Sequence, residues 1–195
     1  MARTKEFDVE RALDAAIGVF WQHGFDGTST DMLLKAMSIG RQSLYDTFGD
    51  KRELFIAALR KYVTDSTSEL VTMLARAPSP RDGLSDVLVH FAKRAASDAR
   101  GCFGTNATCE LGTSDPEVSS VLEGAAAIFR SALCRAIDTG KARGELDGDI
   151  DTRVAARFVE AQLAGLRVAA RAGADTRTLT NIAEFALRSF DRRTT

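Results

Sequence analysis

The sequence is poor in the residues that build disulfide scaffolds and metal sites. Its 195 residues include three cysteines and two histidines. An odd number of cysteines, without the spacing of a disulfide framework, indicates reduced thiols in a reducing compartment. The two histidines, His23 and His90, lie far apart in the chain, so a histidine-based metal site is not expected.

Long apolar runs are missing too. No stretch approaches the roughly 20 apolar residues that a membrane span requires. The chain also does not open with the charged, apolar and small-residue segments of a secretory signal. We therefore expect a cytoplasmic protein that does not enter a membrane.

An excess of positive charge, which marks many nucleic-acid-binding proteins, is absent as well. The formal net charge is −1, and residues 1–62 carry nine Lys plus Arg against nine Asp plus Glu. Binding to DNA would then depend on a few cations placed against phosphates. The candidates are Arg3, Lys5, Arg41, Lys51 and Arg52.

Catalytic and cofactor-binding patterns are not found. The chain has no glycine loop that could cradle a phosphate, no paired catalytic carboxylates and no Ser–His or Cys–His arrangement. The acids from Asp147 to Asp151 resemble the start of a calcium loop, but Thr152 stands at its glycine position and Phe158 at its glutamate position. We expect no enzyme, no cofactor and no metal.

What the sequence does contain is helical periodicity over nearly its whole length. Apolar residues recur at intervals of three and four, and strand-forming runs are few. Pro78 and Pro80 interrupt the pattern, because a proline cannot continue a helix. The sequence predicts an all-α fold of about nine helices. The expected segments are 8–23, 28–37, 41–48, 51–76, 81–99, a short glycine-bounded stretch in 100–112, 116–139, 151–172 and 176–192.

The stretch from Thr28 to Phe55 has the layout of a helix-turn-helix. Thr28 with Asp31 predicts a helix start, with the threonine hydroxyl as the cap. Ser38-Ile39-Gly40 is the turn. The next helix, Arg41 to Phe48, is too short to be stable unless Leu44 and Phe48 are buried. Its other face then presents polar tips, namely those of Arg41, Gln42, Ser43, Tyr45 and Thr47.

The third helix of this unit begins with a capping pair. Asp50 and Glu53 have the spacing in which each side chain satisfies the other's backbone N–H. Lys51 then lies in the first turn, beside free N–H groups, which favours a phosphate contact.

These residues resemble the N-terminal domain of TetR-family transcriptional regulators. In that family a T-S/T start, a short turn, an L-Y pair, a later aromatic residue and a lysine recur in this order. Here they are Thr28-Ser29, Ser38-Ile39-Gly40, Leu44-Tyr45, Phe48 and Lys51. The family's turn usually reads G-V-S, so glycine replaces a hydroxyl as the cap of the recognition helix. Thr47 stands where a histidine is usual.

The resemblance implies a DNA-binding domain over residues 1–55 and a larger ligand-binding and dimerisation domain over 56–195. It implies a regulator, most often a repressor, that a small-molecule inducer releases from a palindromic operator in double-stranded DNA. We assign base reading to Arg41, Gln42 and Ser43. Phosphate contacts are assigned to Thr28, Ser29, Tyr45, Thr47 and Lys51.

The last two helices favour a homodimer on their own composition. The segment Asp151–Ala172 is apolar nearly all round, and Thr176–Arg192 carries a second apolar face. Two copies would form a four-helix bundle between subunits. The alternative is that both helices complete the core of a monomer. The resemblance favours the dimer, since TetR-family members commonly associate through their last two long helices.

For the inducer, the resemblance implies a variable pocket in the middle helices. A few polar groups in an apolar lining are typical of such sites. The candidate residues are Phe91, Cys102, Phe103, Asn106, Cys109, Glu110, Phe129, Leu133, Phe158, Gln162 and Leu166.

Two other functions stay open at this point. Cys102, beside Arg100 near a helix start, would favour a lowered thiol pKa and a regulator that senses electrophiles or oxidants. A bridge to Cys109 on the same helix is not expected, because seven residues rise ~10.5 Å. The other alternative is an all-α enzyme or binding module that keeps the helix-turn-helix as scaffold.

Overall fold

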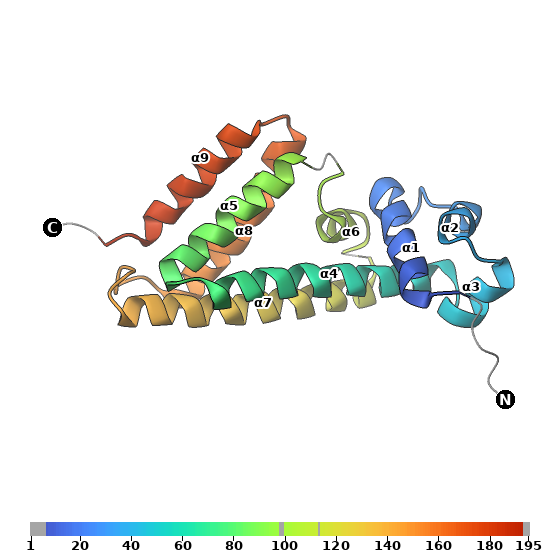
Figure 1. Cartoon of the computed structure of the whole chain (residues 1–195), viewed down its shortest axis with the longest axis horizontal. Coiled ribbons are helices and arrows are strands. Elements are labelled where there is room, and N and C mark those ends of the chain that lie inside the picture. Colours follow the sequence, from blue (N-terminus) through green and yellow to red (C-terminus); the bar gives the residue numbers. More distant parts are fainter. Residues whose placement is uncertain (1–6, 98–99, 113, 193–195) are drawn as a thin grey trace. The chain divides into compact units, whose positions relative to one another are not determined.

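The computed structural model describes residues 7–97, 100–112 and 114–192. Within them the chain forms nine α-helices, one short 3-10 helix and no strand (Figure 1). They are α1 (Val9–His23), α2 (Thr30–Met37), α3 (Arg41–Phe48), α4 (Lys51–Arg76), α5 (Pro80–Ser97), α6 (Phe103–Leu111), α7 (Pro116–Ala142), α8 (Thr152–Arg171), α9 (Thr176–Leu187) and η1 (Arg188–Phe190). The all-α prediction is confirmed.

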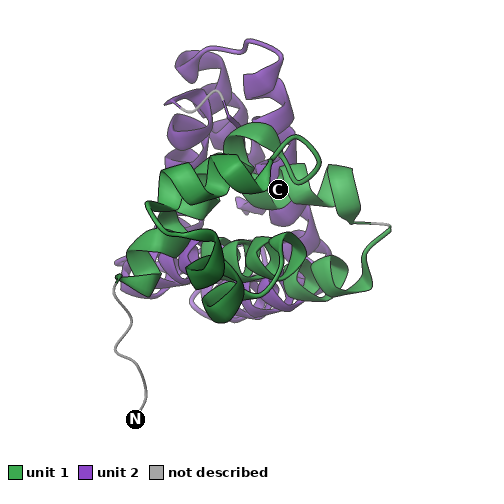
Figure 2. Cartoon of the chain, turned by 90° about the vertical axis from the view of Figure 1, so that its right-hand side faces the viewer, with its two compact units in different colours: residues 1–64, 102–123 green, residues 65–101, 124–195 purple. Residues whose placement is uncertain are grey.

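The chain divides into two compact units (Figure 2). The boundaries fall within α4, between α5 and α6, and within α7. Unit 1 comprises residues 1–64 and 102–123, so it joins α6 and the start of α7 to the helix-turn-helix. Unit 2 comprises residues 65–101 and 124–195. The predicted boundary at residue 55 separates a DNA-binding domain from a ligand-binding and dimerisation domain. It is a division by function, which the two units do not test, and it stays a prediction.

Unit 1 is held together by a chain of aromatic side chains. The Phe55 ring of α4 makes edge contacts with Phe20 at 5.0 Å, Phe25 at 5.2 Å and Phe103 at 5.5 Å between centroids. Phe103 also contacts Tyr62 at 5.6 Å. These rings come from α1, the turn after it, α4 and α6, so α6 is packed into the core that supports the helix-turn-helix.

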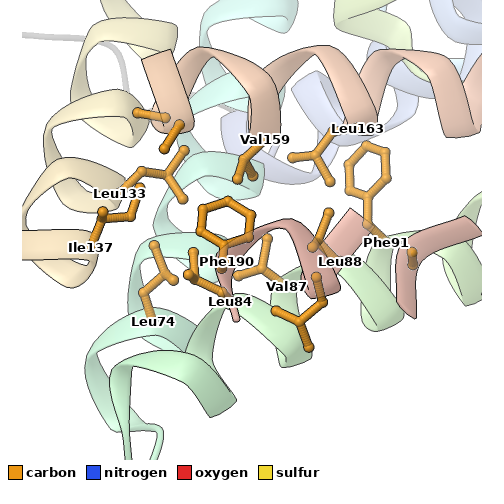
Figure 3. Close-up of a cluster of buried hydrophobic side chains, with 14 of the residues drawn as sticks. Leu74, Leu84, Val87, Leu88, Phe91, Leu133, Ile137, Val159, Leu163 and Phe190 are labelled. Atoms are coloured by element: carbon orange, nitrogen blue, oxygen red, sulfur yellow. The ribbon is translucent and has the colours of Figure 1, made fainter. Parts of the chain in front are cut away.

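Unit 2 has its own hydrophobic core. In it α5 packs against both α8 and α9, and α8 contacts α9. Figure 3 shows the buried side chains that meet there. The labelled ones are Leu74, Leu84, Val87, Leu88, Phe91, Leu133, Ile137, Val159, Leu163 and Phe190.

The helix starts follow the predicted capping residues, with one correction. Asp50 and Glu53 form the reciprocal pair, with N–H···O distances of 2.9 and 2.8 Å. At the start of α7, which was predicted from residue 116, Asp115 accepts hydrogen bonds from the backbone N–H groups of Glu117 and Val118. The prediction that Thr28 caps α2 was wrong. Ser29 is the cap, its hydroxyl accepting from the backbone N–H of Met32 at 3.2 Å.

The C-terminal boundary also differs from the prediction. The last α-helix ends at Leu187 and tightens into η1, where the sequence predicted one helix to Arg192. None of the helices in the described part of the chain is both long and apolar enough to cross a membrane.

Candidate DNA-binding site

The candidate DNA-reading helix, α3, has one buried side. Leu44 is 1% exposed. The half-buried Phe48 meets Phe7 at 6.4 Å between ring centroids. At the N-terminus of α3, Gly40 makes no side-chain cap. Eight residues cannot hold a helix in water by themselves, so these two apolar contacts fix α3 on its support.

The opposite side of α3 presents the predicted polar tips. Arg41 and Gln42 are exposed, Tyr45 is 46% exposed, and Ser43 and Thr47 are half-buried. The five predicted residues of α3 thus form one polar side that contrasts with the buried one. This arrangement suits a helix that enters a major groove.

Two of these tips are paired with acids. The guanidinium of Arg41 lies 2.7 Å from a carboxylate oxygen of Asp31 on α2. The Nε2 of Gln42 donates to Asp46 at 2.8 Å. Neither acid was predicted as a partner: Asp31 was assigned to the start of α2, and Asp46 was not considered, although Gln42 and Asp46 have the i, i+4 spacing of helix neighbours. If Arg41 and Gln42 read bases as predicted, base edges would have to replace these partners.

Thr28 is buried and Lys51 is half-buried, and both side chains, which were predicted to hold phosphates, bond to the backbone of the chain segment before α2. Thr28 is 2% exposed, and its hydroxyl donates to the carbonyl of Gly24 at 2.5 Å. The Nζ of Lys51 donates to the carbonyls of Phe25 at 2.9 Å and Thr28 at 3.0 Å. It also lies 4.2 Å from the centroid of the Phe25 ring. Both residues therefore hold the turn between α1 and α2.

Arg52, the neighbouring candidate cation, is engaged inside unit 1 as well. Two of its nitrogens donate to Asp115 at 2.8 Å, and a third lies 3.1 Å from Glu117. The hydrogen bond from Arg52 is the main cause of a lowered pKa at Asp115. Arg3 and Lys5 lie outside the described residues.

The residues predicted to bind a ligand are divided between the two units. Cys102, Phe103, Asn106, Cys109 and Glu110 belong to unit 1. The other six belong to unit 2, where most are part of the hydrophobic core or pack against it. These six are Phe91, Phe129, Leu133, Phe158, Gln162 and Leu166.

Two of the predicted ligand-binding residues, Phe91 and Glu110, make specific contacts. The guanidinium carbon of Arg167 lies 4.2 Å from the centroid of the Phe91 ring, so a cation covers one face of that aromatic side chain. The carboxylate of Glu110 accepts hydrogen bonds from the backbone N–H groups of Phe25 and Asp26. This geometry gives Glu110 two backbone partners in the turn between α1 and α2. Its role in ligand binding stays a prediction.

A groove of about 250 Å³ lies in unit 2, between α4, the α4–α5 link and α7. Alanine side chains form much of its lining. Arg135, Thr139 and Arg143 also line it. Its lining includes none of the residues predicted to bind the inducer.

The three cysteines are free thiols. Cys102 is buried, and the hydroxyl of Tyr62 lies 3.6 Å from its sulfur. Cys109 is exposed on α6. A buried thiol is shielded from reagents in solvent, so the position of Cys102 gives no support to a sensing role.

The terminal helices keep large apolar side chains in solvent. Val154 and Val168 on α8 are 66% and 65% exposed, and Phe185 on α9 is 73% exposed. Ile182, also on α9, is 38% exposed. The inner sides of both helices are already buried against α5. The chain therefore has more apolar surface here than its own core uses.

Comparison with known families agrees with this geometry over both parts of the chain. Residues 12–58 match the family described as "Bacterial regulatory proteins, tetR family". Residues 80–186 match the "Tetracyclin repressor-like, C-terminal domain". The chain belongs to the TetR family of transcriptional regulators. The resemblance found in the sequence is thereby confirmed.

The similarity to individual relatives covers nearly the whole chain. The HTH-type transcriptional regulator YezE of Bacillus subtilis is 32% identical over 98% of this chain and 100% of its own. The transcriptional repressor ComR of Escherichia coli is 30% identical over 95% and 90%. A cysteine mutant of the TetR-family regulator CifR, solved with 26-bp operator DNA, is 34% identical with a TM-score of 0.77 and covers 96% of this chain and 99% of its own.

Proposed function

We propose that this TetR-family regulator is a cytoplasmic, homodimeric repressor that a small molecule releases from a palindromic operator. The observation that carries the proposal is the exposed polar side of α3, held by a buried side on a compact support. CifR, which is similar over nearly all of this chain, was solved on operator DNA, and the similar ComR is a repressor. A regulator of this kind needs no catalytic group.

Within this proposal, Arg41, Gln42 and Ser43 read base edges. Arginine and glutamine are suited to two-point contacts with guanine and adenine in the major groove. Ser29, Tyr45 and Thr47 contact phosphates beside the bases that are read. Thr28 and Lys51 hold the unit in shape, and Lys51 retains one N–H for a phosphate.

Dimerisation supplies the second half of the reading surface. One α3 reads too few base pairs for specificity, whereas two related by a two-fold axis reach half-sites in successive major grooves. The exposed apolar side chains of α8 and α9 would be buried in a four-helix bundle between subunits.

The inducer would act by linkage. A small molecule that binds better to the DNA-free arrangement must weaken DNA binding by the same factor. The unit 2 residues Phe91, Phe129, Leu133, Phe158, Gln162 and Leu166 remain the proposed lining. They combine an apolar surface with one amide group.

The test is recovery of genomic fragments on the immobilised protein, with and without cell extract. We expect a fragment with an inverted repeat to be enriched, and extract to displace it. Arg41→Ala should then relax discrimination at one position in each half-site, by about 1–3 kcal/mol for a two-point contact. Enrichment of fragments that share no sequence would contradict the proposal.

A further inference from the structure

Helix α6 reaches the turn between α1 and α2, just before the helix-turn-helix, through one carboxylate. Glu110, in the last turn of α6, accepts the backbone N–H of Phe25 at 3.0 Å on one oxygen and that of Asp26 at 2.9 Å on the other. Its partners lie 84 and 85 residues earlier in the chain, in the turn between α1 and α2. Both carboxylate oxygens are used on two consecutive amides, a charge-assisted arrangement that fixes position as well as distance.

The turn itself is shaped to receive this carboxylate. Gly24 has a φ of 72°, a left-handed conformation that glycine adopts without strain. A Cβ on this residue would lie 2.7 Å from one oxygen of Glu110 and 3.0 Å from the other. Any side chain at Gly24 would therefore displace Glu110. Both the close approach of the carboxylate and the left-handed backbone therefore require glycine at position 24.

The same turn is held by a cation on its carbonyl side. Lys51, from the first turn of α4, donates to the carbonyls of Phe25 and Thr28. The N–H groups of the turn thus face an acid from α6, and its C=O groups face an ammonium from α4. Ser29, the cap of α2, follows directly. The placement of α2, and of α3 after it, begins at this turn.

We propose that Glu110 is a positioning residue for DNA reading: it fixes the α1–α2 turn from α6 and so sets the orientation in which α2 and α3 meet the operator. The proposal rests on the proposed DNA-binding function and adds the residue through which α6 acts on it. Glu110 itself contacts no base or phosphate in this role.

Amide hydrogen exchange tests the contact directly. The probes are the backbone amides of Phe25 and Asp26, followed by NMR in the full-length protein. Glu110→Gln keeps one acceptor oxygen and should release one amide, whereas Glu110→Ala should release both. Exchange should be slowest in the wild type and fastest in Glu110→Ala, with Glu110→Gln between them. Unchanged rates at both amides would overturn the contact.

Operator binding tests the consequence, with Asp26→Asn as the matched control. The side chain of Asp26 is exposed in the same turn, so its substitution removes one negative charge close to that of Glu110. The backbone N–H of residue 26 can still donate to Glu110. We expect Glu110→Gln to weaken operator binding about 10-fold relative to Asp26→Asn. Binding to a random duplex should be the same for both variants, since it depends on charge.

A purely structural role would give a different result. If Glu110 only stabilised the fold, operator and random duplex would lose affinity together, in proportion to the unfolded fraction. That outcome, or equal operator affinities for Glu110→Gln and Asp26→Asn, would overturn the proposal. Failure of the DNA-binding function would be seen separately, as a wild-type protein that prefers no sequence.

Discussion

At the scale of single residues, the turn of the helix-turn-helix combines an uncommon conformation with a weak cap. Ser38 has a φ of 55° and is the only non-glycine residue with positive φ among the described residues. Gly40, which starts α3, has extended backbone angles and no side-chain hydrogen bond. Glycine would suit position 38, where φ is positive, and serine would suit position 40, where its hydroxyl could cap α3. The chain has the two residues the other way round.

Exchanging the two residues should stabilise the protein. Ser38→Gly relieves the left-handed strain, worth about 1 kcal/mol. Gly40→Ser adds a cap worth a few tenths of a kcal/mol, and a Cβ there meets no atom within 4 Å. Urea denaturation of the double and single variants, at fixed protein concentration, checks this. A double variant less stable than the wild type would contradict the backbone argument.

A second residue-scale prediction concerns Lys51. Lys51→Met keeps the side-chain stem but leaves two carbonyls of the α1–α2 turn without their partner. We expect a loss of about 1.5–3 kcal/mol in the free energy of unfolding. Lys35→Met, which removes an exposed lysine of α2, is the control and should change stability little. If Lys51→Met kept full stability and lost affinity for every duplex, Lys51 would be a phosphate ligand first.

At the scale of helices, acidic caps link stability to pH. Hydrogen bonds from backbone N–H groups lower the pKa of Asp151, mainly through Val154, and of Asp175, through Thr178. The charged form of each is therefore favoured in the folded state. Its contribution is complete above the ordinary value of 3.8 and disappears as pH falls through the lowered pKa.

Asp151→Asn with Asp175→Asn should therefore flatten the acid side of the stability curve. Asparagine still caps a helix but does not titrate in this range. We expect the double variant to lose less stability than the wild type between pH 5 and pH 3, by denaturation at each pH. Parallel curves for the two proteins would show that these caps are not the titrating groups.

The helices also show how far sequence reasoning could go. Starts with a single capping candidate, such as Asp50 with Glu53, were predicted correctly, because the chemistry allows few alternatives. Thr28 and Ser29 are consecutive hydroxyl residues, and the sequence could not decide which one caps α2. Their burial decided it: Thr28 turns inward to the carbonyl of Gly24, and Ser29 remains for the cap.

At the scale of the whole molecule, contacts between distant segments were the least predictable part. The buried and exposed sides of α3 follow from helical spacing alone. The pairing of Glu110 with the α1–α2 turn, and of Arg52 with Asp115, joins residues more than 60 positions apart. Periodicity within one helix carries no information about such partners. The sequence therefore offered Glu110 as a candidate pocket residue and Arg52 as a candidate cation, without indicating the partners that the fold gives them.

The dimer gives the prediction at this scale. Phe185→Asp places a charge on the exposed apolar face of α9, so burial of that face between subunits would become unfavourable. We expect a monomer by sedimentation at micromolar concentration and a large loss of operator affinity. Ile128→Asp is the control, because Ile128 is 62% exposed on α7, outside the terminal helices. It should remain a dimer. Monomer formation by both variants, or by neither, would contradict the assignment to α8 and α9.

The acids that hold Arg41 and Gln42 have a kinetic consequence. If Arg41 and Gln42 read bases as proposed, the carboxylates of Asp31 and Asp46 would repel the phosphates of random DNA, and no base edge would replace them as partners of the two side chains. Encounters with random sequence should therefore be brief, so that a small number of regulator molecules scans the chromosome without being retained along it. Discrimination against the millions of competing sites would then come from low affinity for non-specific DNA as much as from strong contacts at the operator.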